Sequence, residues 1–124
     1  MNREILFRGI NFQKEWVYGD LFHSYANNDM AILYYREGSK TPTFDAVFSE
    51  SVGQYTGLKD KNGNKIFEGD IVEFTNLDLP NMVIRFDNGS FMLCEDENST
   101  YEELRMNYVV EVVGNIHDNP ELIK

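Results

Sequence analysis

The sequence predicts a mainly β protein in which short antiparallel strands are joined by tight turns, together with one or two short helices. Aromatic residues make up 14% of the chain, with 9 Phe and 7 Tyr, and aromatic rings pack well on a pleated sheet. Short apolar runs recur between segments that carry Gly, Pro, Asn and Asp, which is typical of strands joined by turns. Asn62-Gly63 and Asn88-Gly89 each lie between apolar runs and predict β-hairpins.

The N-terminal part of the chain is expected to form strands, because each of its apolar runs is bounded by glycine or polar residues. These runs are Ile5–Gly9, Trp16–Phe22, Met30–Tyr35 and Phe44–Phe48. In the second run, Trp16 and Tyr18 point to one face, since side chains alternate along a strand. We interpret both rings as a core or subunit contact, because aromatic burial dominates core and interface energetics. A stacking surface for a base or a peptide is the alternative.

The first Asn-Gly pair is expected to form a type I′ turn, in which both central residues adopt a positive φ. The flanking residues then form two antiparallel strands, and another strand is expected to begin at Ile71. The predicted register pairs Lys61 with Asn64, Asp60 with Lys65, Lys59 with Ile66 and Leu58 with Phe67.

The second Asn-Gly pair predicts a hairpin between Met82–Phe86 and Phe91–Cys94. Directly opposed residues share a face of a sheet. The face with Phe86, Ile84, Phe91 and Leu93 is therefore the expected core side. Cys94 then lies on the other face as a small hydrophobic residue, and no base lies close in sequence to activate its thiol.

The C-terminal part of the chain carries the most one-sided charge. No Lys or Arg lies between Arg85 and Arg105, whereas six residues there are acidic: Asp87, Glu95, Asp96, Glu97, Glu102 and Glu103. We interpret this run as a solvated loop, followed by a short helix that the capping-box pattern Thr100–Glu103 predicts.

Two further elements are expected before the last residue. The β-branched run Tyr108–Val113 is typical of a strand covered on both faces. Asn119-Pro120 combines a helix cap with a proline suited to the first helical position, which predicts at most one helical turn.

Composition limits the classes of protein that the chain can represent. The formal net charge is −10, which repels phosphate backbones and anionic membranes and argues against general nucleic-acid binding. Cys94 is the single cysteine, so no internal disulfide is expected. No apolar segment approaches the roughly 20 residues that a membrane span needs. We therefore expect a cytoplasmic protein that does not bind membranes.

No stretch carries a convincing site, so the sequence predicts no catalytic, cofactor-binding or metal-binding residue, no cofactor and no enzymatic activity. The spacing of oxygen-bearing residues from Asp60 suggests a calcium loop. Lys65 and Ile71 occupy the positions that need glycine and a bidentate glutamate, however, so the hairpin explains the stretch better. His23 and His117 lie far apart, without a spacing that would place both on one metal ion.

Three blocks of the sequence together carry a family resemblance. They are Phe7–Leu21, with its Phe-Arg-Gly and Trp-Val-Tyr-Gly-Asp-Leu motifs, Val52–Val72, and Val113–Leu122. The chain resembles the YopX-like family of small phage and prophage proteins along nearly its whole length. The resemblance implies a single domain of coiled, bifurcated sheets, with N-terminal strands at about residues 1–50 packing on a barrel-like part at about 51–124. It also implies a homo-oligomer in the cytoplasm of a bacterial host, and it supplies no activity.

These observations favour a phage or prophage accessory protein, a non-enzymatic and self-assembling interaction module that engages a host or phage protein through its acidic surface. The alternative is nucleic-acid binding by an SH3-like barrel half, since Gly69–Val72 resembles the strand entry of such barrels. Lys59, Lys61 and Lys65 would then form a local basic tip at the first hairpin.

Overall fold

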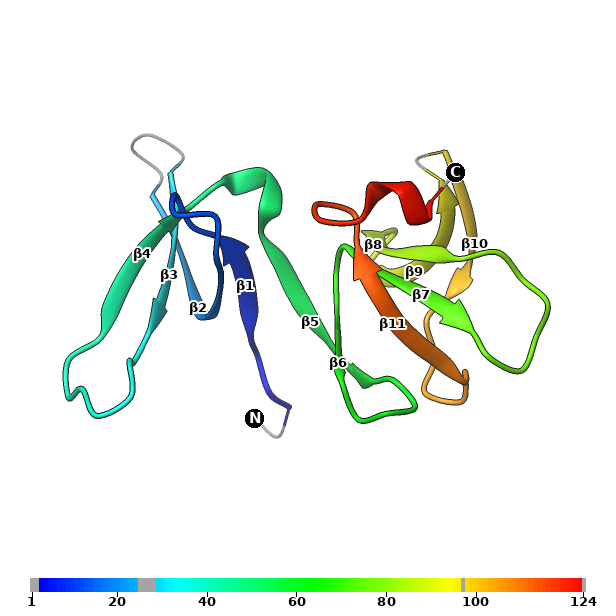
Figure 1. Ribbon diagram of the computed structural model, residues 1–124, viewed down its shortest axis with the longest axis horizontal. Helices are drawn as coiled ribbons and strands as arrows, with labels where there is room; N and C mark the ends of the chain where they lie inside the picture. Colours follow the sequence, from blue (N-terminus) through cyan, green and yellow to red (C-terminus); the bar gives the residue numbers. More distant parts are fainter. Residues whose placement is uncertain (1–2, 25–28, 97, 124) are drawn as a thin grey trace. The chain divides into compact units, whose positions relative to one another are not determined.

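The computed structural model describes residues 3–24, 29–96 and 98–123. Within these residues the protein is built from antiparallel β-strands and two 3-10 helices of three residues each, which confirms the mainly β prediction. The chain forms two compact units, one ending at Tyr55 and the other beginning at Thr56. Figure 1 shows the strands of each unit in sequence colours.

The first unit contains the strands expected from its apolar runs. They are β1 (Phe7–Ile10), β2 (Trp16–His23), β3 (Met30–Tyr34) and β4 (Thr43–Val47), followed by the 3-10 helix η1 (Ser49–Ser51). Neighbours in sequence pair in the order β4-β3-β2-β1, as Figure 1 shows. Gly19 allows β2 to approach β3, because a Cβ at this position would lie 2.1 Å from the carbonyl oxygen of Leu33.

The four strands of the first unit coil so that the end of β4 returns to the end of β1. Asn11 forms an isolated bridge with Val47, and the N–H of Phe48 donates to the carbonyl of Ile10 at 2.9 Å. Val47 then meets Gly9, where an added Cβ would lie 3.0 Å from the Val47 Cβ. The inner side of the coil holds a small core, formed by Val17, Ile32 and Val47.

Strand β5 (Gly53–Lys59) pairs with β1 and, beyond Tyr55, with β6 (Lys65–Phe67). Its hairpin with β6 differs from the predicted one. The N–H of Asp60 donates to the carbonyl of Asn64 at 2.8 Å, and the N–H of Gly63 donates to the carbonyl of Asp60 at 3.0 Å. Gly63 has a φ of 85°, whereas Asn62 is not among the described residues with positive φ. The type I′ turn and the register built on it are therefore wrong.

The observed loop has three residues, and its geometry is that of a type I turn followed by a left-handed glycine. The side chain of Asp60 explains the difference. Its Oδ1 accepts the N–H groups of Asn62 at 2.9 Å and Asn64 at 2.8 Å, so the carboxylate fixes both sides of the turn. An aspartate that bonds to the backbone two residues on is a known alternative to a regular turn.

The second unit is a five-stranded antiparallel sheet that is not closed into a barrel. Its strands have the order β10-β9-β8-β7-β11. They are β7 (Asp70–Phe74), β8 (Met82–Asp87), β9 (Ser90–Asp96), β10 (Ser99–Glu103) and β11 (Val110–Asn115), and the 3-10 helix η2 (Pro120–Leu122) follows. The single turn predicted at Asn119-Pro120 is thus confirmed.

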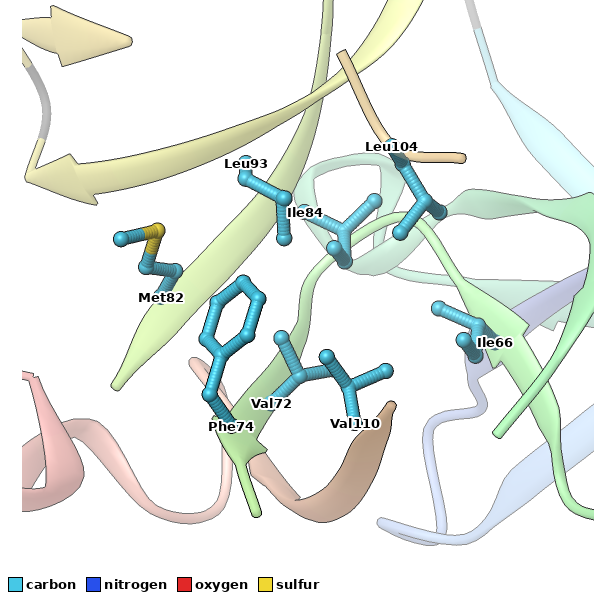
Figure 2. Packing of buried hydrophobic residues seen from close by; sticks show 8 residues of the cluster. All are labelled: Ile66, Val72, Phe74, Met82, Ile84, Leu93, Leu104 and Val110. Carbon is cyan, nitrogen blue, oxygen red and sulfur yellow. The ribbon is translucent and has the colours of Figure 1, made fainter. Parts of the chain in front are cut away.

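The hairpin of β8 and β9 has the predicted turn and register. Asn88 and Gly89 have φ values of 51° and 81°, and Phe86 pairs with Phe91 while Ile84 pairs with Leu93. Ile84 and Leu93 of the expected core side are fully buried, whereas Phe86 on the same side is 54% exposed and lies outside the core. Figure 2 shows Ile84 and Leu93 in the core of this unit, together with Ile66, Val72, Phe74, Met82, Leu104 and Val110.

The acidic run forms a strand pair, and not the predicted loop and helix. The segment predicted as helix is β10, which pairs with β9. The register shifts between Thr100 and Glu102, so the chain bulges where a helix could otherwise begin. Leu104 anchors the end of this segment, because it is 8% exposed in the core and its N–H donates to the carbonyl of Phe91 at 2.9 Å.

Strand β11 also differs from the prediction. Among the described strands it pairs only with β7, and it lies at an edge of the sheet. Val110 is buried, but Val109 and Val113 are 38% and 36% exposed, so the β-branched run is not covered on both faces. A continuous apolar run does not distinguish a buried central strand from an edge strand that is covered on one side.

Candidate functional site

The first unit exposes large aromatic side chains on the outer side of its coiled sheet. Pairing across β2, β3 and β4 places Asp20, Leu33 and Phe44 in one row, and opposed residues share a face. Phe22 lies two residues beyond Asp20, on the same face, and its ring meets that of Phe44 edge to face at 5.8 Å between centroids. We call this surface, formed by Tyr18, Asp20, Phe22, Leu33 and Phe44, the aromatic face.

Three rings of the aromatic face are open to solvent. The exposed fractions are 46% for Tyr18, 52% for Phe22 and 61% for Phe44. The prediction of a core position is thus wrong for Tyr18, and a subunit contact stays a prediction. Trp16, at the start of the same strand, is half-buried, and the guanidinium carbon of Arg8 lies 4.5 Å from the centroid of its ring.

A buried polar network holds the coil that presents the aromatic face. The Nδ2 of Asn11 donates to Oδ2 of Asp45 at 3.1 Å, and the hydroxyl of Tyr34 donates to the same oxygen at 3.0 Å. The Oδ1 of Asn11 accepts the N–H groups of Gln13 and Glu15. Asn11 is only 2% exposed, so these bonds satisfy an amide that would otherwise be costly to bury.

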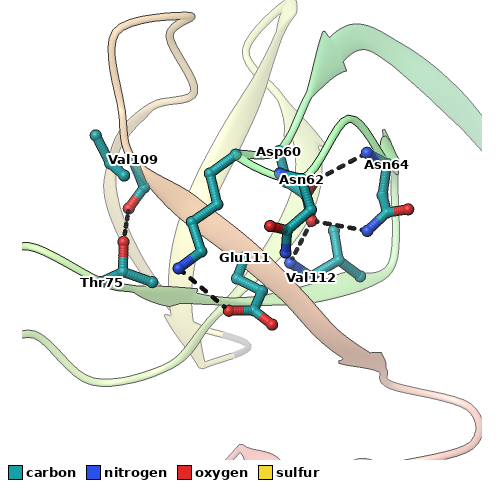
Figure 3. Close-up of polar contacts among 8 residues, drawn as sticks. Asp60, Asn62, Asn64, Thr75, Val109, Glu111 and Val112 are labelled. Atoms are coloured by element: carbon teal, nitrogen blue, oxygen red, sulfur yellow. Dashed lines mark hydrogen bonds and ion pairs between the residues drawn. The ribbon is translucent and has the colours of Figure 1, made fainter.

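Asp60 is the polar centre of the second unit, as Figure 3 shows. Its Oδ2 accepts the N–H of Val112 at 3.0 Å and the side-chain amide of Asn64 at 3.3 Å. Burial raises the pKa of Asp60, but hydrogen bonds from the backbone of Val112, Asn64 and Asn62 and from the Asn64 amide lower it, so the pKa lies below its ordinary value of 3.8. Asp60 would be the first ligand of the calcium loop considered from the sequence, and these donors already bond to its carboxylate.

The lysines of the first hairpin form no uniform basic tip. The Nζ of Lys61 lies 3.6 Å from Oε1 of Glu111 on β11, a contact drawn in Figure 3. Lys59 is exposed and Lys65 is half-buried. Pairing with Glu111 reduces the positive charge that Lys61 offers to a phosphate backbone.

The remaining candidate residues do not assemble into a centre. Cys94 is 1% exposed, and its Sγ contacts the carbonyl of Met92 at 3.8 Å, as expected for a small hydrophobic residue. His23 lies on β2 of the first unit and His117 follows β11 in the second. Across residues 3–24, 29–96 and 98–123, no three His, Cys, Asp or Glu side chains lie close enough together to hold a metal ion. In the same ranges no helix is long and apolar enough to cross a membrane.

The sequence predicts the strands of the aromatic face, but it does not predict that their exposed rings form one surface. The alternation in Trp16–Phe22 places Tyr18 and Phe22 on one side, and Phe44 alternates with Asp45 in the same way. The missing information is the register between β2, β3 and β4, which a single sequence does not supply. Large rings on one side of successive strands are the signal in the sequence that could have indicated the aromatic face.

Comparison with known proteins gives matches that extend over both units. The family model described as YopX protein matches residues 6–124. The chain is also similar to protein EF1440 from Enterococcus faecalis, known from a crystal structure, with a TM-score of 0.60 and 25% sequence identity. That similarity covers 99% of this chain and 100% of the other. A comparison with curated proteins gives no match.

Proposed function

The chain belongs to the YopX family, and we propose that it is a non-enzymatic phage or prophage accessory protein of the bacterial cytoplasm. In this role it assembles with copies of itself and engages a host or phage protein. The observation that carries the proposal is the aromatic face of the first unit. A monomer gains nothing by exposing Tyr18, Phe22 and Phe44 to water, whereas an interface uses such rings as anchors.

A second copy of the chain is the occupant that we propose for the aromatic face. Two identical faces related by a twofold axis bury the same rings on both sides, which is the commonest arrangement of soluble oligomers. An aromatic side chain carries about 150 to 250 Å² of surface. Burying the exposed half of one ring therefore contributes about 2 to 3 kcal/mol at about 25 cal/mol per Å².

The acidic surface of the second unit is the proposed contact for a partner protein. Glu95, Asp96 and Glu103 are exposed on the pair of strands β9 and β10, and the whole chain has a net charge of −10. Such a surface attracts a basic protein and speeds the encounter at low salt. In this proposal the aromatic face joins copies of the chain, and the acidic strand pair binds the partner protein.

Self-assembly is tested by replacing rings of the aromatic face. Sedimentation velocity of the double variant Phe22→Ser, Phe44→Ser should show a smaller particle than the wild type, because two anchors are lost. Leu77→Ser is the matched control, since Leu77 is 51% exposed in the second unit and lies outside the face. Equal sedimentation of all three proteins contradicts the assignment of this face.

The partner is tested by affinity capture from a host lysate at low salt. The wild-type protein should retain a basic host or phage protein, and the charge-reversed variant Glu95→Lys, Glu103→Lys should lose it. Glu37→Lys, an exposed acid of the first unit, is the control. Capture of nothing specific by the wild type counts against the proposed partner.

Nucleic-acid binding through Lys59 and Lys65 is the alternative function. The ion pair between Lys61 and Glu111 and the net charge both weaken it. Filter binding with single-stranded and duplex DNA and RNA at about 50 mM salt, where phosphate contacts are strong, tests it directly. If the wild type retains nucleic acid on the filter and Lys59→Glu does not, nucleic-acid binding would replace the proposed function.

A further inference from the structure

Arg85 occupies an unusual place in the second unit. It is the only basic residue between Lys65 and Arg105, and it lies on β8. Register places it opposite Met92 of β9, on the side of the sheet that also carries Val83 and Cys94. This is the side away from the core residues Ile84 and Leu93.

Arg85 lines two hollows on this side of the sheet. One hollow of about 370 Å³ is polar and is bordered by residues of β8 and β9, by Asn98 just before β10 and by the start of β10: Phe86, Asp87, Cys94, Asn98, Ser99 and Thr100. The other, of about 340 Å³, is mainly apolar and is bordered by Val83, Asp96, Ile116, Pro120 and Ile123. Each hollow is large enough for a small organic molecule.

The guanidinium of Arg85 makes no hydrogen bond or ion pair with the described residues. Its Nε is buried without a partner, although the side chain as a whole is partly exposed. Asp96 borders the second hollow, but its Oδ1 accepts the N–H of Asn98 at 2.8 Å. The buried Nε–H has lost hydration without gaining a hydrogen-bond acceptor, so an acceptor oxygen supplied from outside would bind favourably here.

We propose that Arg85 binds the carboxylate of a small amphipathic acid. The apolar part of this ligand lies in the second hollow, against Val83, Ile116 and Ile123. Asp87 borders the first hollow and Asp96 the second, and both repel a phosphate dianion about twice as strongly as a ligand with one carboxylate. An arginine holds a planar carboxylate through two parallel hydrogen bonds. This site lies within the second unit and is independent of self-assembly.

The probe for the experiment is N-acetyl-L-leucine, which carries one carboxylate and one apolar side chain. N-acetyl-L-leucinamide has the same shape without the charge, and inorganic phosphate has charge without the apolar group. Binding is followed through the side-chain Nε–H signal of Arg85 and backbone amide signals in two-dimensional NMR spectra of the whole chain. The Arg85 signal is assigned from its loss in Arg85→Gln, and Arg105→Gln is the matched control.

The acid should shift the signals of Arg85, Val83 and Ile123, and it should bind at least about tenfold more tightly than the amide, because a charged hydrogen bond is lost in the latter. Phosphate should bind more weakly than the acid, Arg105→Gln should bind normally, and Arg85→Gln should not bind. Equal affinity for acid and amide, tighter binding of phosphate, unchanged binding by Arg85→Gln, or no shift at millimolar acid would each overturn the proposal. If Arg85→Gln does not fold, the acid and the amide on the wild type decide the question.

Discussion

The carboxylate of Asp60 accepts the backbone N–H of Val112 at 3.0 Å, across a separation of 52 residues. The same side chain accepts the N–H groups of Asn62 and Asn64. One acid therefore shapes the β5–β6 turn and attaches it to β11, the edge strand of the second sheet. Asp60 is 7% exposed, so these bonds replace most of the contact that its carboxylate would have with water.

Removing the side chain of Asp60 should destabilise the second unit. Asp60→Ala removes the acceptor of the N–H groups of Asn62, Asn64 and Val112, and we expect the free energy of unfolding to fall by roughly 1 to 3 kcal/mol. Urea denaturation followed by circular dichroism measures the change, since the single tryptophan, Trp16, lies in the first unit. Asp78→Ala, in the exposed loop after β7, is the control and should be nearly neutral. A loss no larger than that of Asp78→Ala would show that the bonds around Asp60 contribute little.

The lowered pKa of Asp60 makes part of the stability depend on pH. A carboxyl group whose folded pKa lies below its unfolded value stabilises the fold above the unfolded pKa, and this contribution is lost as pH falls through the folded pKa. The difference in unfolding free energy between wild type and Asp60→Asn should therefore be constant above the ordinary value of 3.8 and shrink below it. Denaturation curves at a series of pH values measure this difference, and a difference that grows in acid would refute the assignment.

The first hairpin offers a test of turn type. Gly63 has a φ of 85°, so Gly63→Val should cost roughly 1 to 3 kcal/mol through backbone strain. Asn62→Ala should cost much less, because Asn62 does not adopt a positive φ in the observed turn. Thermal unfolding of both variants separates the two turn types, since a type I′ turn would make both substitutions costly.

Close packing of Gly9 against Val47 gives a test of the coil in the first unit. A Cβ at Gly9 would lie 3.0 Å from the Cβ of Val47, so Gly9→Ala should destabilise by about 1 to 3 kcal/mol through overpacking. Adding Val47→Ala should recover part of the loss caused by Gly9→Ala, because it removes Cγ1 and Cγ2 of Val47, which would each lie 3.1 Å from the added Cβ. Strictly additive losses in a double-mutant cycle would mean that the two positions do not touch.

The two Asn-Gly hairpins show how far the sequence alone can predict this fold. Asn88-Gly89 gives the predicted turn and register, with positive φ at both central residues. Asn62-Gly63 does not, because Asp60 bonds to the adjacent backbone and to Val112, a residue distant in sequence. Local preference predicts where the chain turns, whereas the detailed turn depends on side chains brought in by the fold.

The candidate surfaces depend on long-range pairing even more strongly. The aromatic face needs the register of β2, β3 and β4, and the hollows at Arg85 need β8, β10 and the segment after β11 to come together. The alternation of Tyr18 and Phe22 predicts a shared face, but it does not tell whether another layer covers that face. The sequence also does not tell whether another layer covers both sides of β11. For this reason the prediction that Val109 and Val113 are buried is wrong, since both are exposed.

The central claim is that the aromatic face of the first unit joins copies of this chain. Its most direct test is the mass of the wild-type protein in solution, measured by native mass spectrometry over a range of concentrations. The account predicts a particle of two or more chains, with that multiple of the 14.4 kDa mass of one chain, and it predicts a return to about 14.4 kDa in Phe22→Ser, Phe44→Ser. A wild-type protein that stays at 14.4 kDa at every concentration would contradict it.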